Sequence, residues 1–446
     1  MSNVQPFRGL RYNVERIGDI SSVISPPYDV ISPEEQGLFH GKSPYNVVRL
    51  ELGEDRPTDS PDKSNKYTRA GDTFRNWLKE GVLIREPVPA FYVLQHCFMQ
   101  QGIPKSRWGL VARVRLAEES AGGTRPHEVI LESRVRDRLN LLHSCPVNIS
   151  SIMGMVHSEG DGLLSLIAGF AKGTPHLSAV DQQGVTHNMW VVTDGPSLEQ
   201  ISASCADKVI YIADGHHRYE TALAHRREQQ NASPNNGRDD AYNFVMMALT
   251  DVGDPGMVAL SAHRLVRLPL YEGLGGLVER LSPLFNLEYL EPSGVSLSDR
   301  LKAWLDTLGD RGREALAIGV YGLSEKRLCL LTLRNKSKIR DLLPSKRSEV
   351  WKNLDVSILH WVIFRHMMGI DTPQKEEECI KYVRDEEEAI NRVDSEECQL
   401  AFLMNPVPLS SVLAVADAGD RMPPKSTYFY PKLPTGLVMN PLWDDE

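Results

Sequence analysis

A mixed α/β fold is predicted by two features of the sequence. Strand-like apolar runs alternate with amphipathic helical segments along the chain, and one such run leads directly into a helix through an Asp-Gly turn. Alternation of this kind is typical of domains in which helices cover a sheet. The 446 residues also exceed the usual length of one domain, so we expect two to four domains or one large composite fold.

The first elements are indicated by capping and turn residues. A helix is expected to begin at Ser32, because a serine N-cap, a proline and two carboxylates follow one another there. A second helix is predicted over 67–80, with Gly81 as its C-terminal cap. The runs at 90–98 and 108–116 predict a β-hairpin.

The remaining elements continue the alternation. The segment from Arg125 to Leu142 is interpreted as a loop that leads into a helix. Strands are predicted at 149–156, 188–193, 208–213, 243–250, 315–321 and 327–333. Helices are predicted at 218–229, 274–282, 299–308 and 355–369, and the stretch 399–416 as strand, loop and helix.

Composition excludes several classes of protein. The chain has 50 Lys+Arg against 59 Asp+Glu, a net charge of −9, whereas proteins that bind nucleic acid usually show a basic footprint. No apolar stretch is long enough to predict a membrane span, and the first residues lack the apolar core of a secretory signal. Six scattered cysteines without a CxxC pair indicate reduced thiols. We therefore expect a cytoplasmic protein without nucleic acid or membrane partners, of unknown oligomeric state.

The most informative motif is Asp214-Gly215-His216-His217-Arg218, between a buried strand and a helix. A strand–turn–helix of this kind directs the positive end of the helix dipole toward a ligand, and glycine permits close approach of the backbone. Arginine and histidine supply donors to phosphate oxygens, and Asp214 could hold magnesium or orient a hydroxyl. Alternatively, Asp214 is only a helix cap and the histidines lie on the surface.

Three weaker candidates lie elsewhere in the chain. Glu128, next to His127 on a loop, is a plausible general base or simply a surface carboxylate. Lys425 and Lys432 could reach an anionic ligand from a proline-framed segment that lacks the glycines of a P-loop. Asp29 follows two prolines and a tyrosine in a rigid turn. Transition-metal binding by the histidines at 127, 216 and 217 is the competing chemistry, and no metal site is assigned.

Several segments together resemble a known family. FRGLRYN, SSVISPPYDVIS, SPYNVVRLEL, PHE, DRLNLL, IADGHHRYETAL, SAHRLV and MPPKSTYFYPKLPTGL occur in this order along the chain. The sequence is thereby identified as a member of the bacterial and archaeal domain-of-unknown-function family 1015. Membership implies no particular reaction.

PHE at 126–128 and DGHHR at 214–218 also resemble, more distantly, the free serine kinase branch of the ParB/sulfiredoxin-like fold. The resemblance implies a nucleotide-site core at 121–240, preceded by an α+β segment at 1–120 and followed by an α/β segment at 241–446. It implies that Glu128 is the catalytic base and that Asp214 assists the hydroxyl or the magnesium. Gly215, His216, His217 and Arg218 would hold the phosphates. From the residues themselves, Lys425 is a further candidate for phosphate binding, and His127 and Asp29 are candidates for the substrate side.

The resulting hypothesis is a small-molecule kinase or related phosphotransferase. Its substrates would be ADP or ATP, with Mg²⁺, and a small molecule that carries a serine-like hydroxyl. Phosphoryl transfer requires positioning, charge neutralisation and a base, which these residues would supply. Two alternatives stay open at this point: a nucleotide-binding regulatory protein with little or no turnover, and a metal-dependent hydrolase.

Overall fold

The structure, a computed structural model, describes residues 4–61, 63–118, 123–158, 162–206, 208–232, 240–268, 274–291, 296–323 and 327–443. Contacts divide the chain into two compact units. The first comprises Met1–Pro126, Ile130–Val258 and Pro431–Glu446, and the second comprises His127–Val129 and Ala259–Tyr430. Each unit thus contains segments that are distant in sequence. The three consecutive segments expected from the sequence stay a prediction about domain organisation.

A mixed sheet forms the centre of the first unit, which confirms the predicted mixed α/β class. In the described part of the chain it has nine strands, in the order β6-β11-β8-β12-β5-β4-β10-β9, with β1 paired to β5. Strands β8 and β12 are parallel, as are β6 and β11, and the other neighbours are antiparallel. The bounds are β1 Val4–Gln5, β4 Phe91–Gln100, β5 Ile103–Arg115, β6 Thr124–Arg125, β8 Ile152–Val156, β9 Leu177–Val180, β10 Thr186–Val192, β11 Ile210–Asp214 and β12 Phe244–Asp251.

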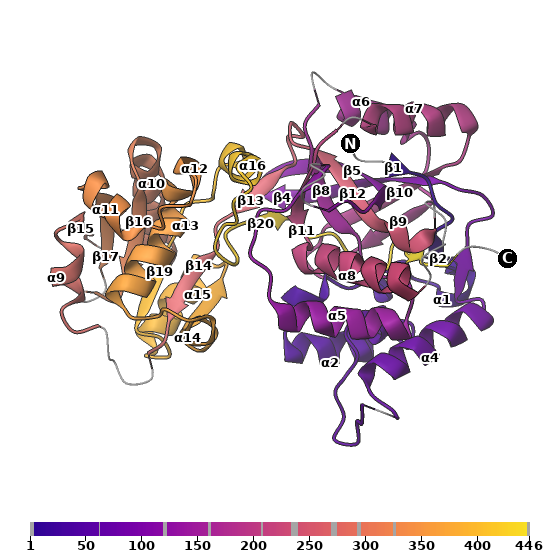
Figure 1. Ribbon diagram of the computed structural model, residues 1–446, viewed down its shortest axis with the longest axis horizontal. Helices are drawn as coiled ribbons and strands as arrows, with labels where there is room; N and C mark the ends of the chain where they lie inside the picture. Colours follow the sequence, from indigo (N-terminus) through magenta and orange to yellow (C-terminus); the bar gives the residue numbers. More distant parts are fainter. Residues whose placement is uncertain are drawn as a thin grey trace. The chain divides into compact units, whose positions relative to one another are not determined.

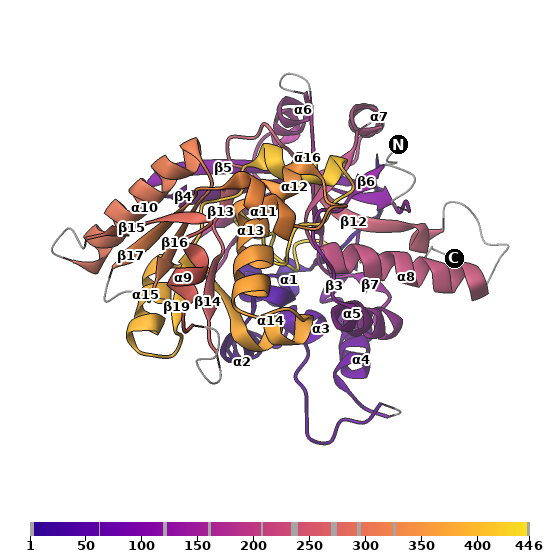
Figure 2. The ribbon, with the colours of Figure 1, turned by 60° about the vertical axis from the view of Figure 1, so that its left-hand side comes forward.

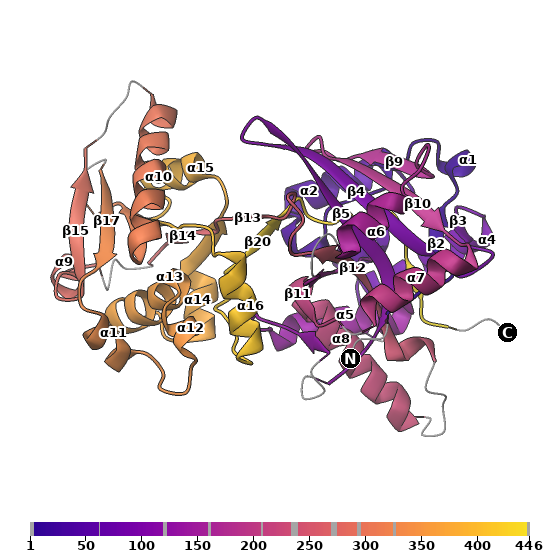
Figure 3. The same cartoon turned by 90° about the horizontal axis from the view of Figure 1, so that it is seen from above.

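Helices lie on both sides of this sheet. Helices α6 (Gly162–Phe170) and α7 (Gly195–Cys205) lie on one side, and α5 (Glu132–Ser144) and α8 (His216–Ala232) on the other (Figures 1 and 3). The remaining elements of the first unit are β2 Leu10–Tyr12, α1 Val14–Ile17, α2 Pro33–Lys42, α3 Val48–Glu51, α4 Lys66–Lys79, β3 Leu83–Arg85, β7 Val147–Asn148 and β21 Asn440–Pro441, with short 3₁₀ turns at Ile20–Ser22, Tyr28–Val30 and Ala241–Asn243. The predicted start of α2 is confirmed, because Ser32 and Glu35 form a reciprocal capping box.

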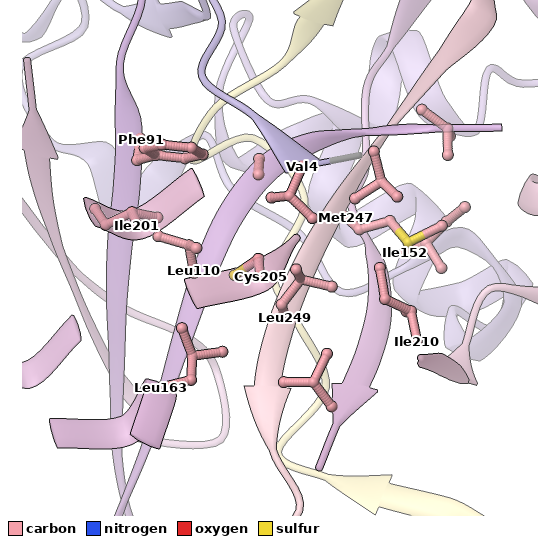
Figure 4. Packing of buried hydrophobic residues seen from close by; sticks show 14 of the residues in the cluster. Val4, Phe91, Leu110, Ile152, Leu163, Ile201, Cys205, Ile210, Met247 and Leu249 are labelled. Carbon is pink, nitrogen blue, oxygen red and sulfur yellow. The ribbon is translucent and has the colours of Figure 1, made fainter. Parts of the chain in front are cut away.

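The main hydrophobic core fills the space between this sheet and its helices. Leu110 of β5, Met247 and Leu249 of β12, and Ile210 of β11 belong to this core (Figure 4). Every residue of β12 is buried, as expected for a strand covered on both faces. Burial of one such aliphatic side chain stabilises the fold by about 1.5–3 kcal/mol, and β11 contributes Ile210 and Ile212 to this core.

The second unit contains an antiparallel sheet in the order β15-β17-β16-β19-β14-β18. Helix α10 packs on β16 and β17 (Figure 2), and α15 packs on β14, β18 and β19. The bounds are β13 Val258–Leu260, β14 His263–Val266, α9 Leu277–Leu281, β15 Phe285–Leu290, α10 Leu297–Glu314, β16 Ala317–Tyr321, β17 Leu328–Leu333, α11 Lys336–Leu342, α12 Glu349–Lys352, α13 Asp355–Ile358, α14 Pro373–Cys379, β18 Ile380–Val383, α15 Glu386–Asp394, β19 Leu400–Leu403, α16 Leu409–Asp417 and β20 Tyr428–Tyr430.

The apolar stretch predicted as one helix over 355–369 has two parts. Only Asp355–Ile358 is α-helical, and Leu359–Met367 continues as a π-helix. Across the described residues, no helix has the length and apolar character needed to cross a membrane.

Candidate functional site

The Asp-Gly turn of the first unit joins β11 to α8. The pairing of β11 with β8 shifts by one residue between Ile212 and Asp214, so the strand ends in an irregularity. Gly215 follows with a φ of +95°, and α8 begins at His216. A Cβ on Gly215 would lie 2.9 Å from Nη2 of Arg218. The positive φ therefore favours glycine, and a Cβ at this position would in addition require the guanidinium of Arg218 to shift.

Substitution of this glycine provides a test of that packing. Gly215→Ala is expected to lower the free energy of unfolding by more than the about 1–2 kcal/mol that a left-handed conformation alone costs. Gly102→Ala is the matched control, because Gly102 has a φ of +76° and open space around it. Urea unfolding of both variants would measure the difference. Equal losses would mean that Arg218 moves aside without cost.

Two cations converge on the carboxylate that ends β11. Lys432 Nζ lies 2.6 Å from Asp214 Oδ1, and Arg218 Nη2 lies 3.0 Å from Asp214 Oδ2. Arg218 Nη1 also donates to the carbonyl oxygen of Ser151 at 2.6 Å. All three charged side chains are largely buried. The carboxylate therefore holds a lysine and an arginine beside the positive end of the α8 dipole.

A third cation, Arg107 in β5, was not predicted from the sequence. It is fully buried, and its Nη2 donates to the carbonyl oxygen of Pro431 at 2.7 Å. Nε and Nη1 have no hydrogen-bond partner among the described residues. Burial lowers the pKa of Arg107 to about 10, whereas the negative charges of Asp254 and Asp214 raise it. The side chain therefore stays protonated at neutral pH. No motif surrounds this arginine in the sequence, so only the fold reveals it.

The two histidines of the motif have different surroundings. His216 is buried at the first position of α8. Nε2 of His217 accepts a hydrogen bond from the backbone N–H of Leu131 at 3.0 Å, which connects the start of α8 to the residue before α5. This contact gives His217 a structural role at the turn, and its phosphate-binding role stays a prediction.

A second cluster in the first unit joins three of the segments that resemble the family, namely PPYD, LEL and DRL. The guanidinium of Arg138 lies 4.1 Å from the ring centroid of Tyr28, and its Nη1 donates to the carbonyl oxygen of Glu51 at 2.7 Å. Ser150 donates to the Glu51 carboxylate at 2.8 Å. Burial raises the pKa of Tyr28 to about 12. The positive charge of Arg138 lowers this pKa, and the negative charge of Asp29 raises it. The tyrosine therefore stays neutral and stacks on the cation.

This second cluster is linked to the Asp-Gly turn by a small cavity of about 50 Å³. Its polar lining includes Glu51, Arg138, Ser150 and Arg218. The predicted residue Asp29 is next to Tyr28 in the same short 3₁₀ turn. The SPPYD, LEL, DRL and DGHHR segments therefore belong to one continuous region of the first unit.

The other predicted residues lie in the second unit. Glu128 Oε1 accepts a hydrogen bond from the backbone N–H of Lys425 at 3.0 Å. The lysine has a φ of +54°, and its carbonyl oxygen accepts from Arg264 at 3.1 Å. His127 is fully buried, with Nε2 3.3 Å from the hydroxyl of Thr427. The structure thus pairs the segment that contains His127 and Glu128 with the segment that contains Lys425.

Comparison with known proteins gives a family assignment. A family model described as "Protein of unknown function (DUF1015)" matches residues 4–357. The chain belongs to the DUF1015 family. The matched residues include the PPYD, PHE and DGHHR segments, and the MPPKSTYFYPK segment follows them in the chain.

Solved structures show distant similarities to this DUF1015 chain, whereas none of the curated proteins matches it. A conserved hypothetical protein from Pyrococcus furiosus has 10% identity and a TM-score of 0.37, covering 74% of this chain and 95% of that one. Free serine kinase in complex with AMP has 10% identity and a TM-score of 0.34, with coverage of 72% and 86%. SbnI with a C-terminal truncation, from Staphylococcus aureus, has 11% identity and a TM-score of 0.34, with coverage of 75% and 90%.

Proposed function

We propose that the turn between β11 and α8 binds the phosphate groups of a nucleotide and that the protein is a small-molecule kinase or related phosphotransferase. In the proposed reaction, the terminal phosphoryl group of ADP or ATP leaves its bridging oxygen. It forms a bond to the hydroxyl oxygen of a serine-like acceptor, whose proton passes to a base. The distant motif resemblance to the free serine kinase branch of the ParB/sulfiredoxin-like fold implies this acceptor class and assigns the base to Glu128.

The concentration of positive charge around Asp214 is the observation that supports the proposal. Arg218 and Lys432 contact one carboxylate, Arg107 is attracted by the same carboxylate, and a long helix begins there. A phosphate group carries more negative charge than one carboxylate and accepts several hydrogen bonds at once. Helix N-termini with an adjacent glycine are common phosphate sites. The turn therefore has the charge and the donors that a nucleotide phosphate requires.

The role of Asp214 as a magnesium ligand stays a prediction. One oxygen of Asp214 contacts Lys432 and the other contacts Arg218, and each oxygen keeps a further lone pair. In the structure, Asp214 positions these two cations. No step of the proposed reaction depends on a magnesium ion held by this residue.

The proposal is tested by replacing the arginine at the turn. Arg218→Ala removes charge-assisted hydrogen bonds worth about 1.5–3 kcal/mol each, so ADP and ATP affinity should fall at least about tenfold. Isothermal titration calorimetry with ADP, ATP and AMP would measure the affinity for each nucleotide. The matched control is Arg227→Ala, since Arg227 lies on the same helix, is exposed and pairs with Glu118. Unchanged nucleotide affinity in Arg218→Ala would remove this turn from the proposed site.

A second candidate function is nucleotide-binding regulation with little or no turnover. It is favoured by one observation: the carboxylate of Glu128 already accepts a hydrogen bond from a backbone N–H, a structural role that does not require catalysis. A product assay with nucleotide and a panel of hydroxyl amino acids separates the two functions. Nucleotide binding without a phosphorylated product would favour the regulator.

A further inference from the structure

Helices α5 and α8 lie side by side on one face of the first unit (Figures 1 and 2). His143 is in the last turn of α5, and His225 and Glu228 are in the middle of α8. Residues three apart on a helix project from the same face. The two helices therefore present two imidazoles and one carboxylate to the same place, well along α8 from the Asp-Gly turn.

The potential ligand atoms of these three residues lie within 4.8 Å of one another. Nε2 of His143 lies 2.7 Å from Oε2 of Glu228, and Nδ1 of His225 lies 4.0 Å from the same oxygen. The two imidazole rings have a centroid distance of 6.0 Å. Ligands around one tetrahedral zinc ion, with bonds of about 2.0–2.2 Å, have separations of similar size.

His225 supplies an independent indication of a ligand. This side chain is about nine-tenths buried, yet its Nδ1 has no hydrogen-bond partner among the described residues. A buried polar atom without a partner carries an energetic cost, and native structures usually satisfy it. A cation held at this position would use the Nδ1 lone pair, and His143 and Glu228 would complete the set from the exposed side.

We propose that His143, His225 and Glu228 form a binding site for a zinc ion. Two neutral imidazoles and a carboxylate are a common zinc ligand set, and water would take the fourth position. Magnesium and calcium prefer sites made of oxygen ligands, so this mixed set discriminates against them. The ion would fasten the end of α5 to α8, the helix that begins at the Asp-Gly turn. This role does not depend on the proposed phosphotransferase activity.

The experiment uses the full chain after removal of metal with a chelator. Zn²⁺, Co²⁺ and Mg²⁺ are titrated separately, with calorimetry for affinity and visible absorption for the coordination geometry of Co²⁺. We expect one zinc equivalent per chain, an absorption band of tetrahedral Co²⁺, and no response to Mg²⁺. His225→Ala and Glu228→Gln are each expected to weaken zinc binding at least tenfold.

Controls make each result decisive. His157→Ala removes an exposed histidine outside the cluster and should bind zinc as the unmodified protein does. Glu228→Gln alters an exposed side chain and is expected to stay folded, which circular dichroism would verify. Absence of a one-equivalent zinc site, or equal zinc affinity in both cluster variants and the control, would overturn the proposal. The three side chains would then be only an ion pair beside a buried histidine.

Discussion

Glu128→Gln is expected to lower turnover about 10²–10⁴-fold, the usual contribution of a general base, while nucleotide affinity stays nearly unchanged. Glutamine keeps the size of the side chain and a carbonyl oxygen that can accept the hydrogen bond from the N–H of Lys425. It cannot take a proton from the acceptor hydroxyl. A loss confined to the chemical step is the pattern of a missing transition-state interaction. Steady-state kinetics with a serine-like acceptor, together with nucleotide titration, would measure both quantities.

The control for this prediction is Glu132→Gln, which alters an exposed glutamate at the start of α5. It should leave turnover unchanged. Full activity in Glu128→Gln would remove the carboxylate from catalysis. A parallel loss of nucleotide affinity would assign Glu128 to binding. A structural effect is distinguished from both by the thermal unfolding of the variant.

Arg138→Ala is expected to lower the free energy of unfolding by about 3–5 kcal/mol, the usual effect of breaking a buried ion pair. Nη1 of Arg138 lies 3.9 Å from Oε1 of Glu51, and both side chains are almost completely buried. The substitution leaves the Glu51 charge without this partner and removes the cation that covers the ring of Tyr28. Urea unfolding followed by circular dichroism would measure the loss.

Two further variants identify the cause of that loss. Arg136→Ala removes an exposed arginine from the same helix and should change stability by less than about 0.5 kcal/mol. Glu51→Gln combined with Arg138→Ala should recover part of the loss, because the buried charge is then absent. A double variant that is as unstable as the sum of the single variants would show that packing, and not charge, is responsible.

The parts of the fold that the sequence predicted are those decided by neighbouring residues. The capping box at Ser32 and the hairpin of β4 and β5 depend on contacts or hydrogen bonds close in sequence. The turn from β11 into α8 depends on one glycine between an apolar run and an amphipathic helix. Local propensity therefore sufficed to place Asp214, Gly215 and Arg218 at one turn.

The features of the fold and of the candidate site that were not predicted depend on contacts between residues distant in sequence. Arg107 lies in β5, where it pairs with His96 of β4, and no local pattern in the sequence indicates that it is buried. His143 and His225 are separated by 82 positions and meet because α5 packs on α8. The π-helix at Leu359–Met367 has the same apolar composition as an α-helix, so the hydrogen-bond pattern could not be predicted from composition. In each case the tertiary structure selects among locally equivalent possibilities.

The return of Pro431–Glu446 to the first unit has a consequence for synthesis on the ribosome. Lys432, which contacts Asp214, and the carbonyl oxygen of Pro431, which accepts from Arg107, are translated after the whole second unit. Asn440 hydrogen-bonds to Asn148, a contact over 292 positions, and contacts of such long range form late in folding. A nascent or prematurely terminated chain that stops before Pro431 therefore contains the Asp-Gly turn. It lacks Lys432, which contacts Asp214, and the carbonyl oxygen of Pro431, which accepts a hydrogen bond from Arg107. Assembly of the charged side chains around Asp214 is consequently coupled to translation of the segment that begins at Pro431.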